Sequence, residues 1–391
     1  MDFSLTHEQR MLVETVREFI RNELTPLEDK LEETGVLTPE TARDIFEKSR
    51  ALGLYGMNIP EEHGGGGLSI LESMLVEEQF GHTTDILIRR AFGNVYEVLL
   101  SCTGAQVDRW LAPAVSGDRV CSIAFTEPGA GSDAAGIKTR ARRDGDKWIL
   151  NGMKHFISDG AFSDFFVVTA VTDPEKGHRG ISMFLVDKGT PGFTVGRDQP
   201  MMGIRGTSHL ELHFDDVELT DENLLGEEGG GLKLALSVLG RVRLAQGAAR
   251  SIGKATKVLS MTLDYARDRR QFGQAIGEFQ MVQQMLADSA IEINAARTAL
   301  WECAWQMDQG MDPRAKISML KVQASETLGR VVDRAMQIYG GMGFSKDLPI
   351  ERYYRDARIY RIFDGASEIH RSVVAKSLLK GGASAFDPFG A

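Results

Sequence analysis

The residues with the clearest chemical potential lie near the end of the chain, between positions 351 and 371, in the stretch ERYYRDARIYRIFDGASEIHR. The pattern predicts a basic, aromatic-rich helix, a break at Asp364-Gly365 and a second helix that begins near Ser367. Glycine lets a ligand approach the backbone closely, and the free N–H groups of the second helix carry partial positive charge. Asp364 can therefore either act on a ligand or cap the helix.

A second polar segment, Ser122–Asp133 (SIAFTEPGAGSD), begins with a short apolar run. Thr126 and Ser132 can donate hydrogen bonds, and the glycines between them expose backbone N–H groups. This combination suits the polar edge of a ring cofactor or a phosphate, although a surface turn uses the same residue types.

Two further segments place arginine or glycine at the end of a helix. Asp268–Gly273 (DRRQFG) either clamps a pyrophosphate or forms a solvated helix end that the helix dipole favours. Gln337–Gly343 (QIYGGMG) stops a helix on glycines, as a plain C-cap does. The four glycines at 64–67 lack the Gly-Lys-Ser/Thr that follows in a phosphate loop, and we interpret them as a connecting loop.

The elements that must position these segments fall into three predicted domains and a loose tail. Residues 1–118 have helical periodicity and helix-start signals at Thr6 and Thr38. Helical periodicity returns at 229–380, where long helices with short links predict a four-helix bundle. We expect residues 381–391 to form a flexible tail.

Between these helical domains, residues 119–228 contain short apolar runs separated by turn residues. The pairs Asp144-Gly145 and Asn151-Gly152 each lie between two such runs, which is typical of two-residue hairpins. The spacing predicts an antiparallel β-barrel or sandwich.

Composition bounds the class of protein. The 391 residues are 42% apolar and 26% charged, as in ordinary globular proteins, and the net charge of −10 disfavours nucleic acid and anionic membranes as partners. The three cysteines, Cys102, Cys121 and Cys303, are too scattered for a disulfide framework or a metal site. The absence of a signal peptide pattern and of a membrane-length apolar run leads us to expect a cytoplasmic protein.

The ordered motifs TEPGAGSD, KHFIS, GIRGTS, RRQFG, QIYGGMGF and FDGASEIHR resemble those of the acyl-CoA dehydrogenase family over nearly the whole chain. The resemblance implies an N-terminal helical domain, a central antiparallel β-barrel and a C-terminal four-helix bundle. It also implies a homo-oligomer, a tetramer built as a dimer of dimers, with a dimer as the alternative.

The resemblance further implies non-covalent FAD, bound between the barrel and the bundle with help from a neighbouring subunit. The residues that it assigns to FAD are Phe125, Thr126, Ser132, Phe156, Ser158, Arg269, Gln271, Phe272, Gln280, Gln337, Gly341, Ala366 and Glu368. The four from Arg269 to Gln280 would reach the FAD of another subunit. Phe156 and Ser158 stand where the family usually has Trp and Thr, and Ala366 and Glu368 stand where it often has Thr and Gln.

The implied reaction is α,β-dehydrogenation of an acyl-CoA thioester, in which a carboxylate removes the α-proton and flavin N5 accepts the β-hydride. Most members of the family place Glu where this chain has Asp364, and some place Glu on the first long helix of the bundle. The range Lys233–Thr256 contains no acid, so Asp364 is the expected base. On the substrate side we expect Ser132, Gly365 and Arg243. Of these, Arg243 would face either the CoA phosphates or solvent.

Three functional hypotheses remain open on the sequence. The first is a dehydrogenase that passes electrons to an electron-transfer flavoprotein. The second is a flavin oxidase or monooxygenase, because nitroalkane oxidases carry Asp at this position on the same scaffold. The third is a non-catalytic relative that binds nucleic acid, which the acidic balance disfavours. Residues 86–100 and the bundle helices are expected to line the acyl pocket, whose depth the sequence does not reveal.

Overall fold

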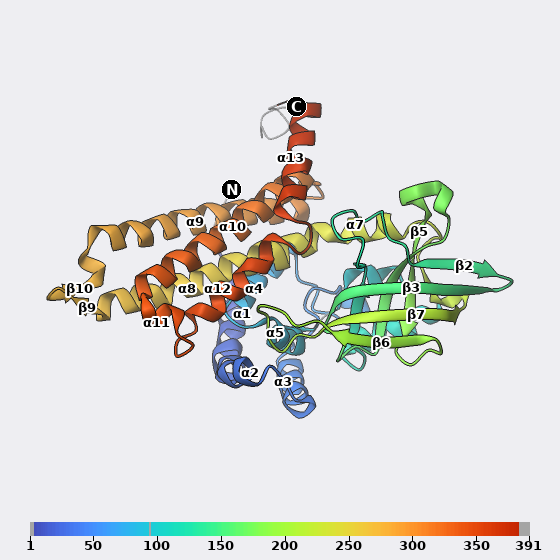
Figure 1. The fold of residues 1–391 in the computed structure, drawn as a ribbon, viewed down its shortest axis with the longest axis horizontal. Coiled ribbons are helices and arrows are strands. Elements are labelled where there is room, and N and C mark those ends of the chain that lie inside the picture. Colours follow the sequence, from blue (N-terminus) through green and yellow to red (C-terminus); the bar gives the residue numbers. More distant parts are fainter. Residues whose placement is uncertain (1–3, 94, 383–391) are drawn as a thin grey trace. The chain divides into compact units, whose positions relative to one another are not determined.

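A computed structural model describes residues 4–93 and 95–382 (Figure 1). The chain divides into two compact units. One comprises Met1–Pro26, Ser69–Thr84 and Gly240–Ala391, and the other comprises Leu27–Leu68 and Asp85–Leu239. Most of the predicted tail at 381–391 lies outside the described residues, and the three-domain division stays a prediction.

The first unit is helical. Its helices are α1 His7–Phe19, α4 Ile70–Phe80, α8 Arg250–Asp268, α9 Gln280–Asp308, α10 Arg314–Tyr339, α11 Gly341–Phe344, α12 Ile350–Ala357 and α13 Ser367–Gly381. Shorter turns of π or 3₁₀ helix occupy Ile20–Leu24, Arg243–Ala249, Ile276–Glu278 and Arg358–Arg361, and Arg270–Gln271 pairs with Gln274–Ala275 as the small hairpin β9–β10. Helix α10 contacts both α8 and α9 along the bundle (Figure 1).

Local sequence explains where these helices begin and how closely they pack. The capping box predicted at Thr6 is present, with Thr6 and Gln9 exchanging side-chain and backbone hydrogen bonds of 3.1 and 3.2 Å. Helix α8 crosses α4 at Gly253, where a Cβ atom would lie 1.7 Å from the carbonyl oxygen of Glu78. The small residues of α8 therefore set the distance between these two helices.

The second unit combines short helices with a sheet. Its helices are α2 Glu28–Thr34, α3 Pro39–Ala51, α5 Asp85–Phe92, α6 Ala112–Ser116 and α7 Gly231–Val242. Further turns occupy Thr25–Leu27, Glu61–His63, Glu97–Ser101, Val107–Leu111, Pro174–Gly180 and Asp221–Asn223. The strands are β1 Cys121–Ala124, β2 Arg140–Asp144, β3 Lys147–Ser158, β4 Phe165–Val171, β5 Ile181–Asp187, β6 Phe193–Asp198, β7 His209–Leu219 and β8 Leu224–Leu225.

The eight strands form one sheet in the order β6-β7-β3-β2-β4-β5-β8, and β1 pairs with β4. Most pairs are antiparallel as predicted, but β4 runs parallel to β1 and, at one position, to β2. The hairpin predicted at Asp144-Gly145 is confirmed: Asp144 pairs with Lys147 at the end of β2 and β3, so the two turn residues are Gly145 and Asp146. Strand alternation buries Phe166, Val168 and Phe184 in the sheet's core.

The second predicted hairpin, at Asn151-Gly152, is wrong. Residues Lys147–Ser158 form a single strand, and its register against β7 shifts between Leu150 and Gly152. Gly152, at φ 144°, marks a bulge instead of a turn, since its missing side chain leaves room for Thr139. Local pattern alone does not separate a glycine bulge from a glycine turn.

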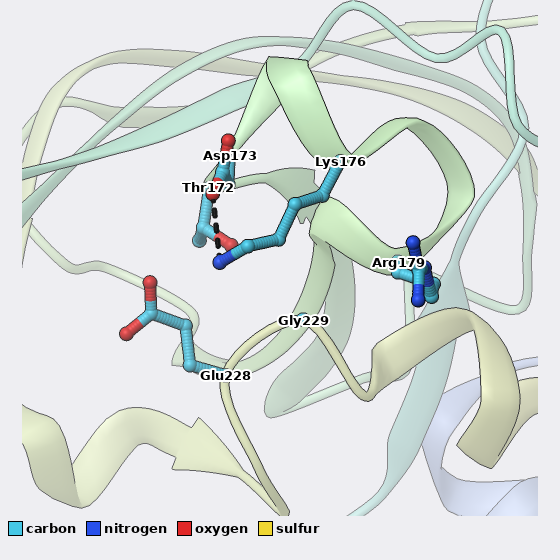
Figure 2. Close-up of a pocket in the computed structure, with 6 residues that line it drawn as sticks. All are labelled: Thr172, Asp173, Lys176, Arg179, Glu228 and Gly229. Atoms are coloured by element: carbon cyan, nitrogen blue, oxygen red, sulfur yellow. Dashed lines mark ion pairs between the residues drawn. The ribbon is translucent and has the colours of Figure 1, made fainter.

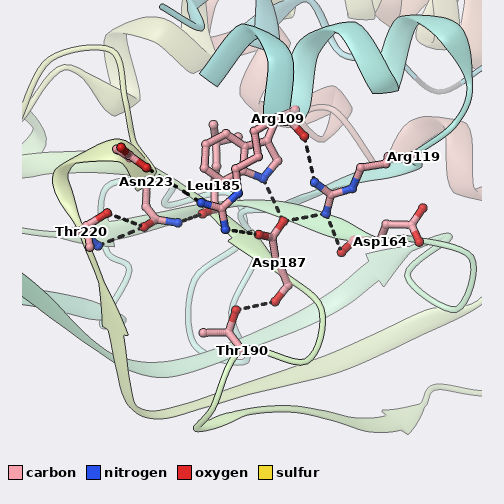
Figure 3. Close-up of polar contacts among 10 residues, drawn as sticks. Arg109, Arg119, Asp164, Leu185, Asp187, Thr190, Thr220 and Asn223 are labelled. Carbon is pink, nitrogen blue, oxygen red and sulfur yellow. Dashed lines mark hydrogen bonds and ion pairs between the residues drawn. The ribbon is translucent and has the colours of Figure 1, made fainter. Parts of the chain in front are cut away.

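Asp187, at the end of β5, gathers a polar cluster in this unit (Figure 3). Its carboxylate accepts hydrogen bonds from Arg109 at 2.7 Å, Trp110 Nε1 at 2.9 Å and Arg119 at 2.6 Å. Burial opposes the charge, but the arginines and Trp110 hold the pKa of Asp187 below its usual value. The cluster fastens the turn before α6 to the sheet.

No helix among the described residues has both the length and the apolar character needed to cross a membrane.

Candidate active site

Asp364 lies in the short turn between the 3₁₀ helix Arg358–Arg361 and α13. Asp364 and Gly365 are both left-handed, at φ 53° and φ 97°. The N-cap of α13 is Ala366, whose side chain makes no capping hydrogen bond. Asp364 lies two residues before this N-cap, so the interpretation of Asp364 as the capping residue is wrong.

Three basic side chains from different parts of the first unit bind the carbonyl groups of this turn. Arg243 Nε and His370 Nε2 each lie 3.1 Å from the Asp364 carbonyl oxygen. Lys321 Nζ donates to the Gly365 carbonyl oxygen at 2.8 Å. The turn is thus held through two successive carbonyl groups. The sequence did not single out Lys321 or His370, because their partners lie 44 and six residues away.

Burial governs the charge states of these side chains. It lowers the pKa of Lys321 to about 8, and the charge of Asp364 opposes the change. It lowers the pKa of His370 to about 4, assisted by the nearby charge of Arg243. It also lowers the pKa of Arg243, again opposed by Asp364. Near neutral pH the site therefore contains a neutral histidine and two cations that face one carboxylate.

The prediction that Arg243 contacts CoA phosphates stays untested. In the part of the chain that the structure describes, its side chain is half-buried and donates to the Asp364 carbonyl group. It stands at the start of the π-helical stretch Arg243–Ala249. A π turn adds one residue to the helix and rotates the side chains that follow it, and such turns are frequent at functional sites.

The start of α13 has the features of an anion site, and this bears on the FAD diphosphate. Ser367 is 1% exposed, and its Oγ has no hydrogen-bond partner among the described residues. Ala366, the N-cap, also provides no side-chain acceptor for the first N–H groups of the helix. A phosphate group would satisfy both, so these residues fit the cofactor. Glu368 is exposed, which leaves its charge in solvent.

The other predicted cofactor segment, in the second unit, is built around a buried ion pair. Lys154 is completely buried and donates to Glu127 Oε1 at 2.8 Å, to Thr169 Oγ1 at 3.1 Å and to the Phe125 carbonyl oxygen at 3.1 Å. Burial lowers the pKa of Lys154 to about 8, and Glu127 opposes the change. The pair fixes the loop that carries Thr126. Glu127 and Lys154 belong to the motifs TEPGAGSD and KHFIS, but nothing in the sequence indicated that they pair.

Phe156 lies in the stretch between Lys154 and Ile157 where β3 shifts its register against β7, and Ser158 pairs with His209 of β7 just beyond it. Phe156 has φ 58°, is 45% exposed and stacks on His155 with ring centroids 3.9 Å apart. Ser158 accepts a hydrogen bond from Ser122 Oγ at 2.7 Å through its carbonyl oxygen. The exposed aromatic face beside the Thr126 loop suits a planar ring, and Ser132 lies exposed on the same loop.

The remaining predicted FAD residues lie on the surface of the first unit. Arg269, Gln271, Phe272, Gln280, Gln337 and Gly341 are all exposed. Phe272 is 95% exposed at the tip of the β9–β10 hairpin. An apolar ring so far into solvent is consistent with the expected contact with another subunit, which stays a prediction.

A surface pocket of the second unit contains none of the predicted site residues (Figure 2). It is lined by Thr172, Asp173, Lys176, Arg179, Glu228 and Gly229. Lys176 pairs with Asp173 at 2.9 Å, so its charge is already compensated. We assign it no function.

Comparison with known proteins agrees with this order along the chain of a helical start, a central sheet and a helical end. Models of the acyl-CoA dehydrogenase N-terminal, middle and C-terminal domains match residues 6–118, 122–217 and 229–379. The chain belongs to the acyl-CoA dehydrogenase family.

Individual relatives align over nearly the whole chain. The acryloyl-CoA reductase (NADH) of Anaerotignum propionicum is 38% identical, over 97% of this chain and 96% of that protein. The mitochondrial short-chain specific acyl-CoA dehydrogenase of Bos taurus is 38% identical, over 96% and 91%. The structure of butyryl-CoA dehydrogenase from Megasphaera elsdenii superposes with a TM-score of 0.89 at 34% identity, covering 97% and 100% of the two chains.

Proposed function

We propose that this protein dehydrogenates short-chain acyl-CoA thioesters to trans-2-enoyl-CoA, with Asp364 as the base. Family membership makes the protein an oxidoreductase of the acyl-CoA dehydrogenase type, with FAD as its cofactor. The short chain length rests on the short-chain specific relative and on the butyryl-CoA dehydrogenase structure.

The observation that carries the assignment of the base is the turn at Asp364. Asp364 lies before the N-cap of α13, on a left-handed turn. The carbonyl groups of this turn accept hydrogen bonds from Arg243, Lys321 and His370. When bound, FAD accepts the β-hydride of the substrate. Asp364 takes the α-proton, so both hydrogens leave the thioester and a C=C bond forms between the α and β carbons. The charges of Arg243 and Lys321 interact with that of the Asp364 carboxylate, which acts as the base in this step.

Aspartate is one methylene shorter than glutamate, so the turn or the substrate must bring the carboxylate within hydrogen-bond reach of the α-carbon. No acid occurs in Lys233–Thr256, the other place where the family carries its base. Asp364 therefore remains our assignment.

Three further features belong to this proposal. We infer an electron-transfer flavoprotein as the electron acceptor, on the basis of the family resemblance. We infer a homo-oligomer, a tetramer or a dimer, because the exposed Phe272 and Arg269 correspond to residues expected at another subunit's FAD. We infer a cytoplasmic location, because Cys102, Cys121 and Cys303 are all free, as is usual in a reducing compartment.

The test is anaerobic mixing of the purified flavoprotein with butyryl-CoA, followed by bleaching of the flavin absorbance. We expect rapid bleaching in the wild type and bleaching about 10² to 10⁴ times slower in Asp364→Ala and Asp364→Asn, the usual contribution of a positioned base. Flavin content and melting temperature serve as controls for folding. An Asp364→Ala variant that bleaches at the wild-type rate would refute the assignment of the base.

Asp364→Glu tests the fit of the shorter side chain. Recovered bleaching would show that the site accepts the longer acid, and lost bleaching would show that it is built for aspartate. Rapid release of hydrogen peroxide in air after reduction would instead favour the oxidase hypothesis.

A further inference from the structure

The turn that carries Asp364 is under backbone strain and is restrained by three side chains. We propose that Arg243, Lys321 and His370 form a carbonyl clamp that positions the Asp364 carboxylate for proton removal, and that His370 is a positioning residue of the reaction. The inference rests on the proposed function, since it concerns the same base.

The first argument is the conformation of the turn. Asp364 and Gly365 are consecutive left-handed residues, at φ 53° and φ 97°. The left-handed conformation is unfavourable for a residue that carries a side chain, and it persists where the surroundings hold it. The hydrogen bonds from Arg243 and His370 to the Asp364 carbonyl group, both 3.1 Å long, supply that restraint at the strained residue itself.

The second argument is the protonation of His370, which its two partners decide. The Asp364 carbonyl oxygen can only accept a hydrogen bond, so Nε2 of His370 must carry a proton. Since burial keeps the ring neutral near pH 7, Nδ1 is unprotonated and accepts from Ser318 Oγ at 3.1 Å. Ser318 therefore fixes the ring in the orientation that donates to the turn, as supporting groups do for catalytic histidines.

The third argument is the space left around the ring. A Cβ atom at Gly365 would lie 2.8 Å from His370 Nε2. The glycine thus serves both the left-handed backbone and the close approach of the imidazole. His370 is 1% exposed and Ser318 is 2% exposed, so water does not replace this hydrogen bond.

The fourth argument is the route of Lys321, which reaches the turn from α10 through the bundle core. Its stem passes Gly247 of the π-helical stretch, where a Cβ atom would lie 3.1 Å from Lys321 Cγ. Its Nζ donates to the carbonyl oxygens of Tyr360 and Gly365, both at 2.8 Å. It therefore joins the two ends of the segment that contains Asp364.

A buried histidine that merely fills the core would make the same contacts, and the two roles differ in what its removal changes. A structural role predicts a lower melting temperature with unchanged chemistry in the molecules that fold. A positioning role predicts a slower chemical step, since a base displaced by about 1 Å can lose on the order of 10²-fold in rate. The test must therefore separate chemistry from binding and from folding.

The experiment compares His370→Leu, which cannot donate, with His370→Gln, whose amide can donate to the same carbonyl group. His82→Leu is the control, because it removes another histidine whose pKa burial lowers, in a part of the unit that does not touch the turn. The readouts are the rate of flavin bleaching by butyryl-CoA, the dissociation constant of butyryl-CoA and the effect of α-deuteration on the bleaching rate.

We expect His370→Leu to bleach about 10²-fold more slowly, with a larger α-deuterium effect and a nearly unchanged dissociation constant. His370→Gln should recover most of the rate, and His82→Leu should keep the wild-type rate. A His370→Leu variant that keeps the wild-type rate, or that loses no more than His82→Leu, would overturn the proposal.

Hydrogen–deuterium exchange of the peptide spanning 360–370 provides a readout that does not depend on turnover. We expect faster exchange in His370→Leu and near-wild-type exchange in His370→Gln. Unchanged exchange in His370→Leu would overturn the clamp even if activity fell. A wild-type protein that no acyl-CoA bleaches would refute the proposed function itself, which the exchange experiment distinguishes from failure of the clamp.

Discussion

At position 364 the side chain supplies a short carboxylate, and its backbone supplies the carbonyl group by which the turn is held. Asp364 therefore supplies both the carboxylate and the carbonyl group that the neighbouring side chains hold. Asp364→Glu keeps both groups and lengthens the side chain, so it tests the reach of the acid separately from the restraint of the turn. The same division appears at Lys154, which binds Glu127 with its charge and the Phe125 carbonyl group with its remaining donors. In both places a buried cation fixes backbone beside a predicted reacting or cofactor-binding residue.

Asp187 gives a prediction at the residue scale that concerns stability. Replacing it with alanine leaves Trp110 Nε1, on a ring that is 0% exposed, without its acceptor and removes one carboxylate partner of Arg109 and of Arg119. We expect Asp187→Ala to lower the free energy of unfolding by about 1–3 kcal/mol, the usual cost of an unsatisfied buried donor. Urea unfolding monitored by tryptophan fluorescence measures it.

The matched control is Asp44→Ala, which breaks an exposed ion pair with Lys48 on α3. Exposed pairs are screened by water and contribute little, so unfolding should be unchanged. Equal losses in the two variants would contradict the role given to the Asp187 cluster.

At the scale of elements, glycine determines how helices and strands approach one another. The crossing of α4 and α8 depends on Gly253 and Gly81, at which Cβ atoms would lie 1.7 and 2.4 Å from carbonyl oxygens of the opposite helix. In β3, Gly152 similarly admits Thr139 and bends the strand. These helices and strands therefore approach their neighbours most closely at positions where glycine has no side chain.

Gly253→Ala tests this packing. The added methyl group has no space beside the Glu78 carbonyl group, so α4 and α8 must separate, and we expect a loss of about 1–3 kcal/mol or more. Gly329→Ala in α10 is the control, because nothing lies within 4 Å of its Cβ position. That change should stabilise the protein by about 0.5–1 kcal/mol, since alanine favours helix. Thermal unfolding of both variants checks the opposite signs.

At the scale of the whole molecule, buried histidines set how stability depends on pH. Burial lowers the pKa of His82 to about 3 and that of His370 to about 4, from 6.5 in the unfolded chain. Below pH 6.5 these histidines bind protons in the unfolded state and stay unprotonated in the folded state. The stability that these groups contribute is therefore complete above pH 6.5 and is lost as the pH falls towards 4.

We expect the free energy of unfolding to fall between pH 6.5 and pH 5, with about 1–2 kcal/mol of the loss due to His82. His82→Gln should flatten this part of the curve. Urea midpoints at pH 7, 6 and 5 for wild type and variant measure the effect. Parallel curves for the two proteins would show that His82 titrates normally in the folded state.

Much of the architecture and part of the site follow from local sequence. Helical periodicity, the Thr6 capping box and the hairpin at Asp144-Gly145 each depend on residues close together in the chain, and the structure confirms them. The small strands β6 and β8 and the short helix α2 were not predicted, because they depend on edges and packing that tertiary structure supplies. The sequence motifs also indicated the family of the protein, and they made Asp364 the expected base.

The sequence by itself determined which residue types were present and in which order, and these sufficed for the family and for the proposed base. Only the tertiary structure decided what holds that base, because Arg243, Lys321 and Asp364 are separated by up to 121 residues and meet only when the bundle packs. It also decided that Ala366, not Asp364, is the N-cap of α13 and that Lys154 and Glu127 pair. Such contacts depend on burial and distance between elements, which no local pattern encodes.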